Sequence, residues 1–310
     1  MSASFNQRED VIKLLEISSG LTNEAGNPRF KPIMHQMLED ICNLIDKFDI
    51  TAEEFWQAVN YLHELGGRQE AALLAAGLGL EHYLDMRDDA REQAMGLEGG
   101  TPRTIEGPLY VANAPLSDGF ARMDDGKEAG ETMWLHGQIK DADGQVVAGA
   151  IVDIWHANAL GNYSFFDKSQ SKFNLRRRVK TDANGGYAVR SILPSGYGCP
   201  PDGPTQALLN QLGRHGHRPA HIHFFVSAPG YKHLTTQINL NGDQYLWDDF
   251  AFATREELIA DPIKITDPSL AAQRDIPGDH TEVSFDFILH PATKSKEEIK
   301  VNRLRATIEE

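Results

Sequence analysis

Two histidines separated by one residue are the first feature of this sequence that could do chemistry. His221 and His223 stand in an apolar segment that continues as Phe224, Phe225 and Val226, which is typical of a strand. Strand side chains alternate between two faces, so both imidazoles should lie on one face, with their Cα atoms about 6.6 Å apart. Imidazoles at that spacing can bind one zinc, copper or iron ion. The pattern alone also fits two histidines at the edge of a core.

Two tyrosines in glycine-containing loops are also candidates for metal binding. Tyr163 lies in the run Gly161-Asn162-Tyr163-Ser164, just beyond an expected strand, and Tyr197 lies between Gly196 and Gly198. Small neighbours leave such a ring free to be aimed at a site, although a loop aromatic that caps a core is the alternative. The chain has neither the Cys-x-x-Cys pattern of structural zinc sites nor the His-Glu-x-x-His pattern of metalloproteases.

Four segments together resemble the intradiol ring-cleaving dioxygenases, and the resemblance extends over nearly the whole chain. These segments are Leu135–Gly144, Ile154–Ser164, Pro194–Thr205 and Arg218–His223. In that family, two tyrosines and two histidines bind one non-haem ferric ion per subunit, and a hydroxide completes the site. The resemblance implies Tyr163 and His221 as equatorial ligands, and Tyr197 and His223 as axial ligands.

The ligand types fit a trivalent ion. Tyrosine has a pKa near 10, so forming a phenolate at pH 7 costs roughly 4 kcal/mol, and a bound cation can supply that stabilisation. The resemblance implies cleavage of catechol by O2 to cis,cis-muconate, a reaction of aromatic breakdown in the beta-ketoadipate pathway. It also implies that Tyr197 leaves the metal and accepts a proton from the diol, while Arg218 and Gln237 lie beside the substrate and steer the reaction. A solvent-facing Arg218 is the alternative.

The substrate pocket is expected to be an apolar slot for a flat ring, at the junction between the helical and β parts of the chain. Its lining is taken from the resemblance, and each apolar member could equally be ordinary core. The expected lining residues are Leu73, Ala76, Ile105, Pro108, Leu109, Arg218, Phe250 and Ala251.

Two other functions compete with catechol cleavage. One is a sister enzyme with the same iron that acts on chlorocatechol or hydroxyquinol. The other is a non-catalytic, transthyretin-like binding module that holds a small aromatic molecule or a structural metal. The iron enzyme should be wine-red because phenolate-to-Fe(III) charge transfer absorbs visible light, whereas the binding module should be colourless.

The elements that position these residues are predicted in two blocks. Residues 1–100 read as a helical linker and dimerisation domain, with a contribution from the C-terminal end. A helix is expected from Asn27-Pro28, and a second begins at the capping box formed by Thr51 and Glu54. Residues 101–310 read as an iron-binding catalytic domain. The fold class is therefore α+β, a helical domain followed by an antiparallel β-sandwich.

Local patterns within the second block refine this prediction. Period-two alternation, with turns at Asp143-Gly144 and Asn184-Gly185, predicts strands joined as antiparallel hairpins. Residues 195–218 show few regular signals and are expected to be a functional loop. The run Arg176-Arg177-Arg178 is expected to be a mostly solvated strand face. His156 and His215 are not expected to bind the iron.

Composition excludes several partners. The 310 residues carry 45 acidic and 30 basic side chains, a net charge of −15, which disfavours nucleic acids and anionic membranes. Neither a bilayer-spanning segment nor a signal peptide is expected, and two cysteines suit a reducing cytoplasm. The apolar stripe of the N-terminal helices must be buried, so the resemblance implies a homodimer, with lipid acyl chains as a possible ligand at its two-fold axis.

Overall fold

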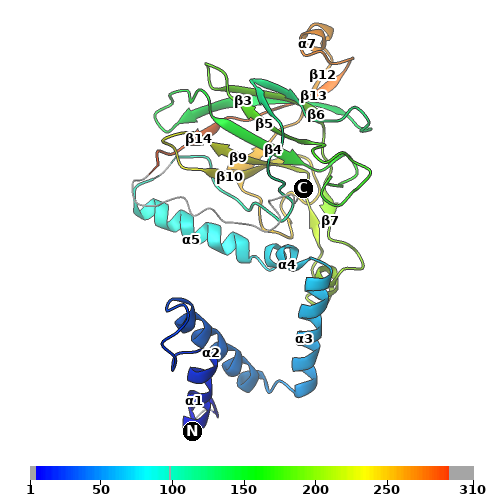
Figure 1. Ribbon diagram of the computed structural model, residues 1–310. Helices are drawn as coiled ribbons and strands as arrows, with labels where there is room; N and C mark the ends of the chain where they lie inside the picture. The colour runs from blue at the N-terminus through cyan, green and yellow to red at the C-terminus, as the bar shows by residue number, and fades with distance from the viewer. Residues whose placement is uncertain (1–4, 98, 293–310) are drawn as a thin grey trace. The chain divides into compact units, whose positions relative to one another are not determined.

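The computed structural model describes residues 5–97 and 99–292 (Figure 1). The chain divides into two compact units, Met1–Gly67 and Arg68–Glu310. The helices of residues 9–94 precede the first strand, and further short helices lie among the strands, so the fold is of mixed α and β type, as predicted. None of the helices in these ranges combines the length and apolar character needed to span a bilayer. The C-terminal end, for which a contribution to the helical part is predicted, lies outside the described residues.

The first unit is helical. Its elements are η1 (Phe5–Gln7), α1 (Glu9–Ser18), α2 (Phe30–Phe48) and α3 (Ala52–Gly67). α3 begins with the predicted capping box, in which Glu54 N donates to Thr51 Oγ1 at 3.2 Å and Thr51 N donates to Glu54 Oε2 at 2.8 Å. α2 begins at Phe30 rather than at Pro28, because Asn27 Oδ1 closes a turn by accepting from the backbone of Arg29 and Phe30.

The second unit begins with two helices and continues as strands. α4 (Ala71–Gly77) and α5 (Leu80–Ala94) lie beside the sheet that contains β9 and β10 (Figure 1). The first six-stranded sheet has the order β1-β5-β4-β9-β10-β11. Its strands are β1 (Leu116–Asp118), β5 (Arg176–Lys180), β4 (Ile151–His156), β9 (His221–Ser227), β10 (Leu234–Leu240) and β11 (Ile259–Ala260).

The second sheet has the order β12-β13-β3-β6-β2, and β14 also pairs with β3. Its strands are β12 (Ile263–Ile265), β13 (His280–Ser284), β3 (Thr132–Asp141), β6 (Gly186–Ile192), β2 (Phe120–Arg122) and β14 (Phe287–Leu289). The remaining elements are η2 (Glu256–Leu258), α7 (Pro268–Gln273), and the pair β7 (Tyr197–Gly198) and β8 (His217–Arg218). Residues 195–218 are more regular than predicted, because this pair and α6 (Pro204–Gln211) lie within them.

The sheets are mixed rather than antiparallel throughout. The central pairs β4–β5, β4–β9, β9–β10 and β3–β6 are antiparallel, whereas the pairs β1–β5, β10–β11, β13–β3, β14–β3 and β2–β6 are parallel. The two glycine turns form as predicted, with φ of +78° at Gly144 and +73° at Gly185. At the first turn, Lys140 and Val146 form an isolated antiparallel bridge, so a short local hairpin does form there. However, each turn leads from a strand of one sheet to a strand of the other, so neither β3–β4 nor β5–β6 pairs as a hairpin.

Both sheets contribute to one hydrophobic core. In β9, Ile222, Phe224 and Val226 are buried in this core, next to residues of β3 and β6. Because strand side chains alternate, His221 and His223 lie on the opposite face of β9. The candidate site is therefore built on the face of the first sheet that points away from the shared core.

Candidate functional site

A row of three side chains crosses the centre of the first sheet. Trp155 of β4 is in register with His223 of β9, and His223 is in register with Gln237 of β10. The Trp155 and His223 rings are stacked, with centroids 4.9 Å apart and an interplanar angle of 5°. Trp155 therefore fixes the plane of the His223 imidazole.

The two histidines point their Nε2 atoms at each other. The Nε2 atoms of His221 and His223 are 3.1 Å apart, and both residues are buried. Burial lowers the pKa of His221 to about 3, with the Arg218 charge adding to the effect, and burial also lowers the pKa of His223 well below its usual value. A neutral His221 that donates from Nδ1 to Pro219 O, at 2.7 Å, keeps a lone pair on Nε2. Burial thus favours the neutral form of both imidazoles, and the neutral form is the one that can bind a metal.

The tyrosines complete the group. Tyr163 Oη lies 3.5 Å from His221 Nε2, and the Tyr163 and Tyr197 rings meet edge to face with centroids 5.5 Å apart. The Tyr197 and His221 ring centroids are 5.4 Å apart. Burial raises the pKa of Tyr163 well above its usual value, so its phenolate needs a nearby cation. Among the described residues, no cluster of three or more His, Cys, Asp or Glu could hold a metal, so a metal site here would depend on the phenol oxygens.

Gly161 lets the loop that carries Tyr163 pass close to Tyr197. Its φ is +79°, and a Cβ at this position would lie 2.7 Å from Tyr197 Cβ and 3.0 Å from Gly196 O. Asn158 Oδ1 closes this turn by accepting from the backbone of Leu160 and Asn162. The glycine is thus required both by the backbone conformation and by the space available.

Gly161→Ala is expected to cost about 2–4 kcal/mol of unfolding free energy, since about 1–2 kcal/mol of left-handed strain is added to a steric clash. Gly144→Ala is the matched control, because Gly144 has φ +78° and nothing within 4 Å of the added Cβ. Urea unfolding should show the larger loss for Gly161→Ala. Equal losses would mean that the Tyr197 contact does not restrict this position.

A hydrogen-bond network holds Arg218 in place, and one of its members, Asp249, was not predicted from the sequence. The residue is 3% exposed, and its Nη1 lies 2.9 Å from His221 Nε2. Nε donates to Asp249 Oδ1 at 3.1 Å, while Nη2 donates to Asp249 Oδ2 at 3.0 Å and to Gln237 Oε1 at 2.8 Å. Burial disfavours the negative charge of Asp249, but the Arg218 guanidinium holds the pKa of Asp249 below its usual value. The solvent-facing alternative for Arg218 is wrong.

The predicted pocket residues divide between two apolar clusters of the second unit. Leu73, Ala76, Ile105, Phe250 and Ala251 belong to one cluster, together with Cys199, Leu209 and Ala253. Leu109 packs instead with Trp155 and Tyr163. Pro108 precedes Leu109 in the chain and is half-buried. A Cβ at Gly107 would lie 3.7 Å from His223 Cε1, so the loop of residues 105–109 passes close to the His223 ring.

Arg176 corrects the prediction of a solvated arginine face. It is 1% exposed, its Nε donates to Ser164 Oγ at 3.0 Å, and its guanidinium carbon lies 5.8 Å from the centroid of the Tyr163 ring. Arg177 and Arg178 are half-buried and donate to backbone carbonyl groups. The run does form the start of strand β5, but the buried Arg176 guanidinium lies next to the Tyr163 ring instead of in solvent.

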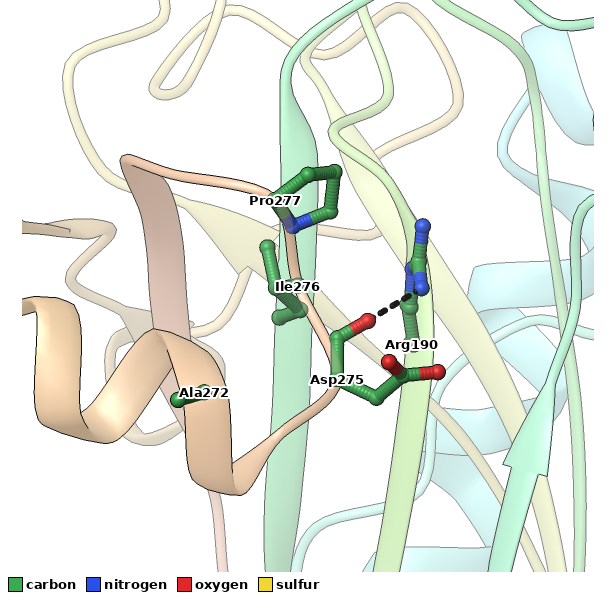
Figure 2. Close-up of a pocket in the computed structure, with 5 residues that line it drawn as sticks. All are labelled: Arg190, Ala272, Asp275, Ile276 and Pro277. Atoms are coloured by element: carbon green, nitrogen blue, oxygen red, sulfur yellow. Dashed lines mark hydrogen bonds between the residues drawn. The ribbon is translucent and has the colours of Figure 1, made fainter.

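A cavity of about 360 Å³ lies in a different part of this unit, between β6 and α7 (Figure 2). It is lined by Arg190, Ala272, Asp275, Ile276 and Pro277. Arg190 Nη1 donates to the Asp275 backbone carbonyl at 2.5 Å. None of the predicted site residues is in this lining.

Comparisons with known proteins match both the helical part and the β part of the chain to dioxygenases. A family described as Dioxygenase matches residues 105–291, and one described as Catechol dioxygenase N terminus matches residues 27–96. The chain is 53% identical to the catechol 1,2-dioxygenase of Acinetobacter baylyi, over 99% of this chain and 100% of that protein. It is 35% identical to the hydroxyquinol 1,2-dioxygenase of a Rhizobium strain, over 86% of this chain and 90% of that protein.

A solved structure also matches this one closely. It is that of catechol 1,2-dioxygenase from Acinetobacter sp. ADP1 inhibited by bound mercury. The TM-score is 0.94 and the identity is 54%, and the match covers 97% of this chain and 99% of that chain.

Proposed function

The chain belongs to the catechol dioxygenase family, and from that premise we propose that it is an intradiol dioxygenase that opens catechol with O2 to cis,cis-muconate in aromatic catabolism. The observation that carries this function is the 53% identity with a catechol 1,2-dioxygenase over essentially the full length of both chains. The 35% identity with a hydroxyquinol enzyme makes a sister substrate the less favoured alternative. A non-catalytic module is not favoured either.

We propose that Tyr163, Tyr197, His221 and His223 hold one non-haem ferric ion. Two observations support the fit. The two imidazoles are buried, neutral and turned toward each other at Nε2, and the phenols are the hard oxygen donors that a trivalent cation prefers. Such an ion, when bound, would stabilise both phenolates and acidify the hydroxyl groups of a bound catechol.

The chain's own side chains then have separate tasks. Tyr197, half-buried on β7, is proposed to accept a proton from the catechol hydroxyl. Arg218 presents Nη1 on the histidine side, where it can stabilise negative charge that develops on the ring. Gln237 accepts from Arg218 through Oε1 and donates to Asn239 Oδ1 at 2.9 Å through Nε2, so its amide is held in one orientation. The apolar residues of the predicted pocket are proposed to exclude water from the ring.

The proposed reaction is tested by kinetics on three diols. Purified protein with one iron per subunit should absorb visible light and consume O2 with catechol, with kcat/KM for catechol above that for chlorocatechol and hydroxyquinol. Chromatography should identify cis,cis-muconate as the product. Iron-loaded protein that takes up no O2 with catechol would contradict the proposed function, and a higher kcat/KM for another diol would move the enzyme to a sister activity.

We further propose that residues 101–310 form the catalytic β-sandwich and that residues 1–100 form a helical linker that makes a homodimer. In support, apolar residues at helical spacing are exposed on α2. They are Phe30, Ile33, Met37, Ile41, Leu44 and Phe48. The same surface could hold lipid acyl chains, and the free thiols of Cys42 and Cys199 support a cytoplasmic location. Light scattering at micromolar concentration should give twice the mass of the chain, and a monomer mass would contradict the dimer.

A further inference from the structure

We propose that Asp249 is a positioning residue of the ring-opening reaction, acting through Arg218. This inference rests on the proposed function. Asp249 follows β10 in the chain and precedes the predicted pocket residues Phe250 and Ala251. The hydrogen bonds of its carboxylate go to Arg218 and to the backbone N–H of Ala251, so Asp249 reaches the site through the groups that it holds as well as through its charge.

The N–H donors of Arg218 are divided between Asp249, Gln237 and the side of the guanidinium that faces His221. A guanidinium has five N–H groups in a fixed planar fork. The Nε–H and one Nη2–H are bound by the two oxygens of Asp249, and the other Nη2–H is bound by Gln237 Oε1. These three contacts lie on one side of the fork, so the nitrogen turned toward His221 is Nη1.

The contact with Asp249 is the one that sets the orientation of the guanidinium. The Asp249 side chain is 1% exposed, and its two-pronged ion pair with Arg218 is fully desolvated. Charge-assisted bidentate bonds are stronger and more directional than a single bond to a neutral amide. Asp249 therefore determines the plane of the guanidinium, while Gln237 supports it from the edge.

The Asp249 carboxylate is also connected to the predicted pocket. Asp249 Oδ1 also accepts from Ala251 N at 3.0 Å, and Phe250 N donates to His217 O at 3.1 Å. The segment of residues 249–251 is thereby joined to β8, which carries Arg218. The bond from Ala251 N needs only an oxygen acceptor, which asparagine also provides. The replacement of Asp249 by asparagine therefore changes chiefly the direction of Arg218 Nη1.

The test compares two adjacent carboxylates. Asp249→Asn keeps the shape of the side chain but brings an amide N–H against the donors of Arg218. We expect kcat for catechol to fall about 10–10²-fold, since small misplacements of catalytic groups have effects of this size, with KM within about threefold and iron content unchanged. Asp248→Asn is the matched control, because Asp248 is 79% exposed and pairs with His215. It should leave kcat unchanged.

A double-mutant cycle separates positioning from a general structural role. If Asp249 acts through Arg218, adding Asp249→Asn to Arg218→Met should change kcat by less than about twofold. The same loss in both backgrounds, or an unchanged kcat for Asp249→Asn alone, would overturn the proposal. The fraction of rings opened beside, rather than between, the two oxygen-bearing carbons should also rise in Asp249→Asn, and a purely structural defect would not change it.

The remaining outcomes are also decisive. Wild-type protein that holds iron but does not cleave catechol would refute the proposed function, whereas active wild-type enzyme with a fully active Asp249→Asn would refute this inference alone. If the Asp249→Asn protein does not fold because the buried Arg218 charge has lost its partner, the Asp249→Glu variant is measured instead. Glutamate keeps the charge but moves the carboxylate by one methylene, so kcat should fall with iron retained. A wild-type kcat for Asp249→Glu would overturn the proposal.

Discussion

Tyr197→Phe is expected to lower kcat for catechol by about 10²–10⁴-fold, the usual contribution of a positioned proton acceptor. The substitution removes one hydroxyl and keeps the ring that meets Tyr163 edge to face. Tyr197 is in register with Arg218 across the pair β7–β8, so the proposed proton acceptor and the proposed charge-stabilising group share one short element. Because both groups would act on the same bound diol, loss of the hydroxyl should affect turnover far more than folding.

The measurement is kcat per bound iron, because Tyr197 is also a proposed ligand and its loss could lower iron content. Tyr231→Phe is the control, since that hydroxyl donates to Asp141 Oδ2 at 3.3 Å and belongs to no part of the proposed site. It should retain wild-type kcat. If Tyr197→Phe turned over at the wild-type rate per iron, Tyr197 would not be the proton acceptor.

The sequence predicts the chemistry of β9 better than the location of the tyrosines. Period-two alternation is a local property, so it correctly places His221 and His223 on one face, away from Ile222 and Phe224. No local pattern brings Tyr163 to within 3.5 Å of His221, because 57 intervening residues must first fold into strands and loops. That contact was predicted only through the resemblance to a known family.

The turns show the same limit on local reasoning. The sequence predicts turns at Gly144 and Gly185, and both glycines adopt the positive φ that such turns need. A turn sequence fixes the backbone conformation at the turn, but the partner of the next strand depends on which residues complete the core. Here β4 and β5 pair with each other in one sheet, and β3 and β6 pair in the other, so two turns that resemble hairpins join different sheets.

Charged residues are the hardest to place from sequence. Arg176 lies in a run of three arginines and was predicted to be solvated, yet it packs behind Tyr163. Asp249 follows an exposed aspartate in the chain, and nothing nearby in the sequence indicates a buried ion pair with Arg218. Buried charges require partners, and those partners come from distant segments. Only the folded chain shows that both residues belong to the surroundings of the site.

His223→Ala is expected to reduce iron affinity by more than about 10²-fold, since loss of a group that merely orients a ligand already costs about 10–100-fold. The protein should lose its visible absorption and its activity together. The Nε2 atom of His223 lies 3.1 Å from that of His221, and stacking on Trp155 holds the ring in place. Removing this imidazole leaves three of the four proposed donors, and no other described histidine is in register to replace it, because Trp155 and Gln237 occupy the neighbouring strands.

The measurement is iron per subunit by elemental analysis, together with a visible spectrum and urea unfolding. His280→Ala is the matched control: His280 is also a buried histidine in a strand, but it belongs to β13 of the second sheet and contacts Arg274. Both variants remove a buried ring and should lose comparable stability, whereas only His223→Ala should lose iron. Iron retained at wild-type affinity in His223→Ala would show that His223 is not a ligand. Equal iron loss in both variants would show that metal binding responds to packing in general, because a lost ligand and a lost core contact would then have the same effect.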